Sequence, residues 1–128
     1  MKSVILDTNG FLRLLLNDNP EQADKVENLI KKAEAGQVNI LVPQIIIFEI
    51  NFILEKYYLL EKEEILEKLK SLASASYFVV ESRDIFIRAF SLYKQNNVSL
   101  VDCFLVAKAF LEKAKLFTFD QKLHELQG

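Results

Sequence analysis

The hydrophobic and polar positions along the chain form two patterns that alternate. Short apolar runs at residues 3–6, 39–42, 77–80 and 115–119 have the length and the polar boundaries of buried strands. Between them, apolar residues recur every three or four positions, which is the spacing of one helix face. These segments predict helices at about residues 10–16, 20–35, 43–57, 62–74, 83–95 and 99–114, followed by a short terminal helix. Strands that look apolar on both faces and alternate with helices predict an α/β fold, in which helices cover a parallel sheet.

Local signals mark the ends and the burial of some helices. Asn19 is placed to cap a helix that has Pro20 in its first turn, and Gly36 is placed to end it. Residues 62–74 are amphipathic, so one apolar face should point inward. Residues 43–57 are apolar nearly all round, which predicts a helix buried in the core.

The size and composition fit a single soluble domain. The chain has 128 residues, of which 51% are hydrophobic and 27% charged, and this predicts one globular domain over residues 1–128. The longest apolar run, residues 45–54, is interrupted by Glu49 and Asn51 and is far shorter than the roughly 18–20 residues that span a bilayer. The apolar stretch before Asp7 is too short for a signal peptide. We therefore expect a cytoplasmic protein without a membrane segment.

One cysteine and one histidine limit the metal chemistry that is open to the chain. Cys103 and His124 exclude an intrachain disulfide, a thiolate zinc cluster and a histidine-rich site, so any metal must be held by oxygen. Cys103 itself is expected to be a small core residue. The formal net charge of −2 looks unfavourable for nucleic-acid binding, but one divalent ion would neutralise it. Net charge alone therefore does not decide the partner.

Four acids fall near predicted strand ends or helix starts. Asp7 directly follows the first apolar run, and Asp120 directly follows the last one. Glu49 lies in an apolar stretch soon after the second run, and Asp102 lies just inside a helix start. In an open α/β sheet such points gather along the carboxyl edge, where ligands bind. Four acids on that edge predict a metal site, and an all-oxygen ligand set favours Mg²⁺ or Mn²⁺.

Glu49 is the acid whose surroundings argue most for function. An ionised carboxylate amid Ile and Phe side chains should be paired, protonated or bound to metal. The simpler alternatives are a salt bridge to Lys56 or Arg13, or exposure on a thin polar stripe. If the acids do converge, two carboxylates about 4 Å apart repel by about 4 kcal/mol at an effective dielectric near 20, so a cation is needed between them.

The other acids also have structural explanations, of unequal strength. Asp7 could cap the helix that follows. Asp120 has the least satisfying one, because a carboxylate directly after a buried strand needs donors or a cation, although capping the short terminal helix would serve. Ser99 and Asp102 have the spacing of a capping box, which is compatible with metal binding because both roles place the carboxylate at a helix start. Glu81 follows the third apolar run and is expected to be a solvated or capping acid.

With these residues in place, the chain resembles the PIN-domain family, and especially the VapC-type toxins of bacterial and archaeal toxin–antitoxin pairs. The resemblance extends over essentially the whole chain. Its motifs are Asp7-Thr8-Asn9 after the first strand, Glu49 in an Ile/Phe-rich helix, Ser99-Leu100-Val101-Asp102 opening a late helix, and Thr118-Phe119-Asp120-Gln121 near the end. The resemblance implies a three-layer fold, with a short parallel sheet of about four to five strands covered by helices.

The resemblance also implies an activity and partners. One or two Mg²⁺ or Mn²⁺ ions would be held in a ribonuclease site by four catalytic carboxylates: Asp7, Glu49, Asp102 and Asp120. Supporting hydrogen bonds would come from Thr8, Asn9, Ser99 and Thr118. The implied partners are an RNA substrate, a cognate antitoxin and a second copy of the chain. We expect self-association through the apolar residues of 53–60 and 65–72. Gly10 and Cys103 depart from the family pattern, because a bulkier apolar residue and a small Ala are expected at these positions.

Two other classes of function compete with a toxin ribonuclease. A haloacid-dehalogenase phosphatase also begins with an Asp after the first strand, but it needs a second acid where this chain has Asn9. A PIN-like module could bind RNA or protein without cutting, although all four expected acids are present. An RNA-processing nuclease outside a toxin–antitoxin pair also remains open.

Overall fold

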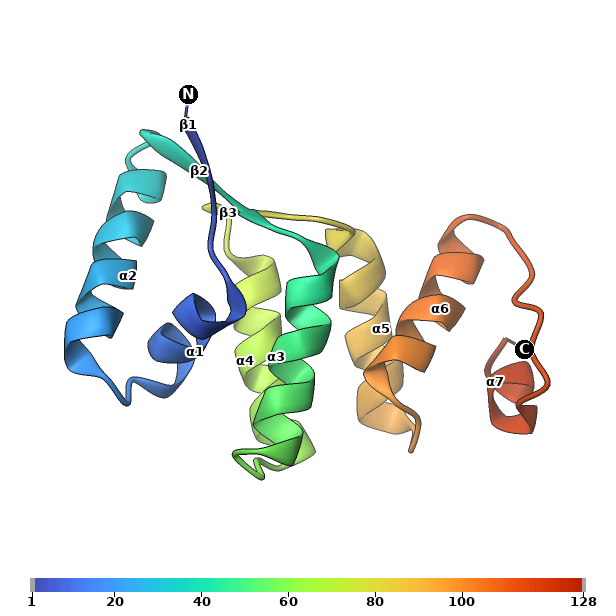
Figure 1. Cartoon of the computed structure of the whole chain (residues 1–128). Helices are drawn as coiled ribbons and strands as arrows, with labels where there is room; N and C mark the ends of the chain where they lie inside the picture. Colours follow the sequence, from blue (N-terminus) through green and yellow to red (C-terminus); the bar gives the residue numbers. More distant parts are fainter. Residues whose placement is uncertain (1, 128) are drawn as a thin grey trace. The chain divides into compact units, whose positions relative to one another are not determined.

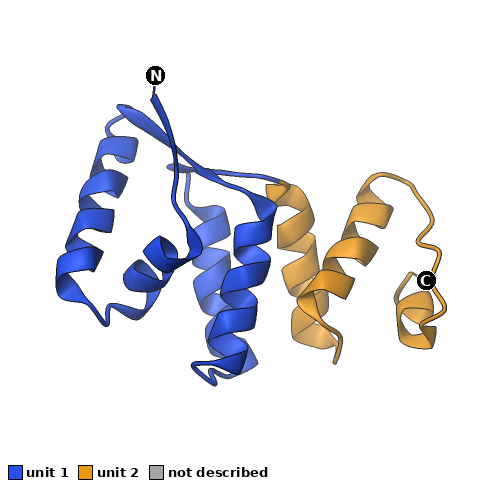
Figure 2. Cartoon of the chain, viewed as in Figure 1, with its two compact units in different colours: residues 1–81 blue, residues 82–128 orange. Residues whose placement is uncertain are grey.

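The structure, a computed structural model, describes residues 2–127. The chain forms two compact units, residues 1–81 and residues 82–128, which we call unit 1 and unit 2 (Figure 2). Unit 1 contains every strand of the described residues, and unit 2 contains helices only. The single domain over residues 1–128 stays a prediction.

Unit 1 is built around a short parallel sheet. Its elements, in chain order, are β1 (Lys2–Ile5), α1 (Thr8–Leu16), α2 (Pro20–Glu34), β2 (Val38–Val42), α3 (Gln44–Lys56), α4 (Lys62–Ser74) and β3 (Phe78–Val80). The strands lie in the order β1-β2-β3 and all pairs are parallel, with Ile5 beside Leu41 and Leu41 beside Val79. The predicted α/β fold with a parallel sheet flanked by helices is confirmed. The described residues contain three strands, one fewer than the sequence pattern predicts.

Within the described part of unit 1, helices cover one face of this sheet. Figure 1 shows the four helices of unit 1 on the same side of the sheet. On that side Ile40, Val42 and Phe78 are buried, and Phe78 meets the ring of Phe11 from α1 edge to face at 5.4 Å. Ile5 and Val79 point the other way, and more than half of each side chain is exposed. The prediction that the first strand is fully buried is therefore wrong, because the Ile5 side chain of β1 is exposed.

The helix boundaries follow the local signals closely. The side chain of Asn19 accepts a hydrogen bond from the backbone N–H of Gln22 at 3.1 Å, and Pro20 is the first residue of α2. Gly36, just after this helix, has a φ of 75°, which a residue with a side chain adopts only with strain. The apolar face of α4 is buried as predicted. The prediction of a fully buried α3 is wrong, since Ile45 and Phe52 are exposed.

As far as the structure describes it, unit 2 contains three helices, α5 (Arg83–Gln95), α6 (Leu100–Leu111) and α7 (Gln121–Leu126). Its core is aromatic: the ring of Phe86 lies 5.8 Å from that of Phe90 and 4.9 Å from that of Phe104. Cys103 is fully buried beside them in α6, which confirms its place as a core residue.

The predicted strand at residues 115–119 is absent. This segment is irregular and precedes α7, and the side chain of Phe119 is 95% exposed. A strand needs the backbone of a second strand as its partner, and in the described structure residues 115–119 pair with none. The backbone of Leu116 bonds to the side chain of Gln127 instead. The N–H of Leu116 donates to Oε1 of Gln127, and Nε2 of Gln127 donates to the carbonyl of Leu116, at 2.9 Å each.

No helix in the described residues combines the length and the apolar character that a membrane span requires.

Candidate active site

Asp7 lies between β1 and α1 and caps that helix. Its backbone is extended, with a φ of −77° and a ψ of 174°, and its Oδ1 accepts a hydrogen bond from the N–H of Gly10 at 2.9 Å. Capping satisfies one of the helix amides that have no partner within the helix. The second carboxylate oxygen has no hydrogen bond in the described structure, and the side chain is exposed. The capping explanation is therefore correct, and it leaves one oxygen available to a ligand.

Gly10, the residue whose N–H bonds to Asp7, has no room for a larger side chain. A Cβ at this position would overlap the side chain of Leu6. Leu6 thus fills the volume that a bulkier residue at position 10 would occupy. The departure from the family pattern concerns packing behind Asp7 and does not remove an oxygen ligand.

Thr8, which follows Asp7, has the most unusual polar atom of the site. The residue is only 5% exposed, and its hydroxyl has no hydrogen-bond partner among the described residues. A buried hydroxyl without a partner destabilises a protein by about 1–3 kcal/mol. Asn9, the third residue of the motif, is exposed.

Replacing Thr8 with Val is expected to raise the free energy of unfolding by about 1 kcal/mol in metal-free buffer, because it removes an unsatisfied buried hydroxyl and keeps the side-chain shape. Urea unfolding followed by circular dichroism measures this. The matched control is Thr118→Val, which should lower stability, since the Thr118 hydroxyl accepts a hydrogen bond from Asp120 N–H at 3.0 Å. A loss of 1 kcal/mol or more in Thr8→Val would show that the hydroxyl is bonded in solution.

Glu49 lies on α3 and is exposed, without a hydrogen bond or ion pair to any described residue. The two cations considered as partners are engaged elsewhere: Arg13 pairs with Asp18 at 3.1 Å, and Lys56 pairs with Glu55 at 3.2 Å. The expectation of a buried, compensated carboxylate is wrong, and the simpler alternative of exposure is correct. Its oxygens are therefore free to bind a cation.

The start of α3 depends on an acid that the sequence pattern did not connect with it. Pro43, the residue before this helix, forms no side-chain cap. Instead, Glu81 at the end of β3 accepts a hydrogen bond from the N–H of Gln44 at 2.8 Å, and its own N–H donates to Val42 at 3.0 Å. Glu81 is thus a capping acid, as expected, but it caps a helix that begins 37 residues earlier. It fixes the start of the helix that carries Glu49.

The two remaining acids belong to unit 2. The Ser99 hydroxyl accepts a hydrogen bond from the N–H of Asp102 at 3.2 Å, but the carboxylate of Asp102 accepts none from a described residue. The predicted capping box is therefore half formed. Asp120 caps α7, because its Oδ1 accepts from the N–H groups of Lys122 and Leu123 at 2.9 and 3.1 Å.

The predicted ligands are thus divided between the units, with Asp7 and Glu49 in unit 1 and Asp102 and Asp120 in unit 2. Within residues 2–127, no three side chains of Asp, Glu, His or Cys form a group that could hold a metal. The convergence of all four acids stays a prediction.

The donor chemistry nevertheless fits a hard divalent cation. All four candidates are carboxylates, and each has at least one oxygen without a hydrogen-bond partner in the described structure. Mg²⁺ and Mn²⁺ prefer such oxygen ligands and retain several waters.

The family of the chain is shown by its match to a model of a known domain family. The model that describes the PIN domain matches residues 4–128, so the match extends over both units. The chain belongs to the PIN-domain family. PIN domains are mostly metal-dependent nucleases and generally use divalent ions. No protein with a curated description matches this PIN domain.

Proposed function

We propose that this PIN domain is a metal-dependent endoribonuclease that hydrolyses phosphodiester bonds of RNA. The observation that carries the proposal is the family match over residues 4–128, in a chain that keeps an acid at each of the four motif positions. The proposed metal ligands and catalytic residues are Asp7, Glu49, Asp102 and Asp120.

The bound metal would supply an activated water and stabilise the charge that develops on the phosphate. The protein's part is to hold the ligands in place. Asp7 and Asp120 are oriented by the helix amides that they cap, and the second oxygen of each has no hydrogen-bond partner among the described residues. Thr8, the residue after the first of these acids, is proposed as a supporting residue. Asn9, Ser99 and Thr118 are the further supporting residues that we propose.

We further propose that the enzyme is the toxin of a toxin–antitoxin pair and forms a homodimer. The loop after α3 exposes three neighbouring apolar residues, Tyr57, Tyr58 and Leu59, which suit an interface with a second copy or an antitoxin. Residues 65–72 do not offer the apolar interface surface that was expected of them, because the apolar side chains of this part of α4 are buried. An upstream gene that encodes a small DNA-binding protein would support the toxin role over RNA processing.

The proposal predicts cleavage of RNA at unpaired loops in the presence of Mn²⁺, because an unpaired strand can bend towards carboxylates where a duplex would not. The assay incubates nuclease-free protein with structured RNA and maps the cuts by primer extension. EDTA should stop cleavage, and excess Mn²⁺ should restore it. The matched control is Asp120→Asn, which keeps the cap of α7, since Asn caps a helix as well as Asp does. Equal cleavage by this variant would contradict the assignment.

A non-cutting RNA-binding module is the second candidate. Such a module would bind the same RNA with equal affinity in Mn²⁺ and EDTA and would leave it intact.

A further inference from the structure

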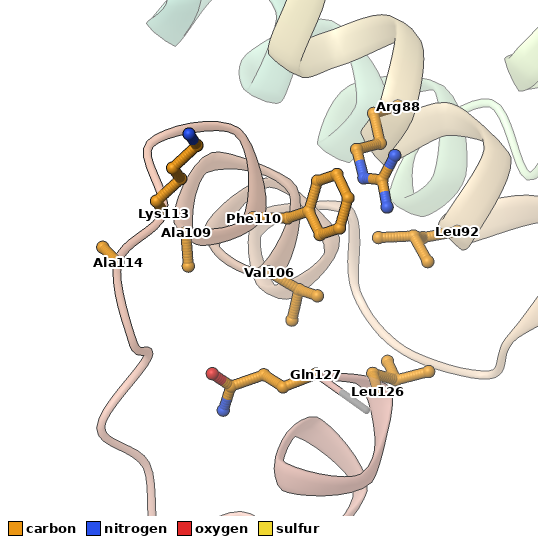
Figure 3. A pocket seen from close by; sticks show the side chains of 9 residues that line it. All are labelled: Arg88, Leu92, Val106, Ala109, Phe110, Lys113, Ala114, Leu126 and Gln127. Atoms are coloured by element: carbon orange, nitrogen blue, oxygen red, sulfur yellow. The ribbon is translucent and has the colours of Figure 1, made fainter.

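Unit 2 contains a pocket that none of the four candidate acids lines. It encloses about 230 Å³ between the C-terminal parts of α6 and α7 and one side of α5. Figure 3 shows Phe110 and Val106 on α6 pointing into it, with Arg88 and Leu92 from α5 above and Gln127 below. Pockets for drug-sized ligands enclose about 300–1,000 Å³, so this one suits a single small group rather than a whole ligand.

The rim of this pocket is positively charged. Arg88 and Lys113 line it, and no acid does. Neither cation forms an ion pair with a described residue, whereas nearby Lys108 is neutralised by Glu112 at 2.9 Å. The two cations are not needed as caps for α6 either, because its last carbonyls already accept from the N–H groups of residues 112, 113 and 114. Their charge is therefore available to an anion from outside.

Phe110 gives the pocket one flat, apolar side. The guanidinium of Arg88 lies over the ring of Phe110, 3.5 Å from its centroid, so two planar groups are stacked. Leu92 and Val106 continue the apolar surface, and 59% of the Phe110 side chain remains exposed. Bases of single-stranded nucleic acids stack on such aromatic and guanidinium planes. A guanidinium held in this way still presents its N–H donors along the edge of the plane, where a phosphate can meet them.

The charge balance of the chain points to the same ligand. Residues 82–128 contain seven Lys and Arg residues and five Asp and Glu residues. Residues 1–81 contain nine Lys and Arg residues and thirteen Asp and Glu residues. Unit 2 is thus basic within an acidic protein, although it carries two of the proposed metal ligands. Phe110 is eight residues after Asp102 on the same helix, which corresponds to about 12 Å along the axis. A strand whose scissile phosphate lies near Asp102 could therefore place a neighbouring nucleotide in the pocket.

We propose that this pocket binds one unpaired nucleotide of the RNA, with the base against Phe110 and the phosphate against Arg88 and Lys113. The proposal rests on the proposed function for the identity of the nucleic acid. It adds a substrate-binding site outside the four acids, which would favour unpaired RNA because a paired base cannot enter.

The test measures binding of a fluorescein-labelled 12-nucleotide single-stranded RNA by anisotropy over a range of NaCl concentrations. The parent protein is Asp120→Asn with Mn²⁺, so that the RNA stays intact. Phe110→Ala should weaken binding about 5- to 100-fold, the fold-change that loss of one stacked base produces, without altering the salt dependence. Phe110→Leu should lose affinity as well, because Leu keeps apolar volume but not the stacking plane. Lys113→Gln should reduce the slope of log K against log[salt] by about 0.7, the value for one phosphate contact in a single strand.

Two matched controls are available in the same unit. Leu111 is an exposed apolar residue of α6 that does not line the pocket, so Leu111→Ala should bind like the parent. Lys94 lies two positions after Leu92, about 200° round the α5 helix, so Lys94→Gln should keep the parent's salt slope. Melting curves of all variants should agree, since the replaced side chains are largely exposed.

Binding by Phe110→Ala and Lys113→Gln within twofold of the parent would overturn the nucleotide site, even if the wild-type protein cuts RNA. RNA binding that depends on Phe110 and Lys113 in a protein that never cuts would overturn the ribonuclease and leave the site standing. If a polyglutamate peptide binds in a Phe110-dependent manner and the RNA does not, the pocket is a protein-binding site and the proposal is wrong.

Discussion

Replacing Glu49 with Gln, or Asp102 with Asn, is expected to lower the rate of RNA cleavage at least about a hundredfold and to change the free energy of unfolding by less than about 0.5 kcal/mol. The rate falls because each variant loses one charged metal ligand, and several kcal/mol of charge stabilisation depend on the metal. Stability is kept because neither carboxylate bonds to another described residue. Single-turnover cleavage with Mn²⁺ and urea unfolding of the same preparations measure the two quantities.

Glu55→Gln is the matched control for this pair of variants. Glu55 is also an exposed acid of α3, but it pairs with Lys56 at 3.2 Å. Its replacement should leave the cleavage rate unchanged. If Glu49→Gln cuts as fast as Glu55→Gln does, Glu49 is an ordinary surface acid and the metal site must use other ligands.

Replacing Phe86 with Ala is expected to destabilise the protein by about 3–5 kcal/mol, the range for deleting a buried aromatic ring. Phe86 is fully buried, and its ring contacts those of Phe90 and Phe104. The change leaves a cavity between α5 and α6 that these two stiff rings cannot fill. Thermal and urea unfolding report the loss.

The neighbouring residue provides the comparison for this variant. Ile87 follows Phe86 on α5 but is about half exposed, so Ile87→Ala should cost less than about 1 kcal/mol. Equal costs for the two variants would contradict the aromatic core of unit 2.

The helices of this protein could be predicted because their signals are local. Asn19 and Pro20 begin α2 through a hydrogen bond and a fixed φ within one turn of chain. The ends of α4, Lys62 and Ser74, also follow from residues within the helix itself. Asp7 and Asp120 were recognisable as caps for the same reason. Their role as metal ligands depends on where distant segments lie, and only the family match supports it.

The predictions that the structure contradicts concern features that depend on residues far away in the sequence. Residues 115–119 have a strand-like composition, but a strand also needs a distant partner, and these residues pair with no strand of the described structure. Glu49 has apolar neighbours in the sequence, but they do not bury its side chain in space. Ile45, Glu49 and Phe52 recur at helical spacing, and all three are exposed on one stripe of α3. The cap from Glu81 was missed because a hydrogen bond across 37 residues leaves no local pattern.

The bonds between Gln127 and Leu116 close a loop with a side chain in place of a second strand. An amide side chain reproduces the donor and acceptor of a peptide group, so one residue near the C-terminus restrains the segment that leads to Asp120. Loss of these two bonds, as in Gln127→Ala, would release the loop and let a trypsin-like protease reach the backbone beside the exposed Lys115 more readily. The order of the segment before Asp120 therefore depends on one amide side chain that is not among the proposed ligands.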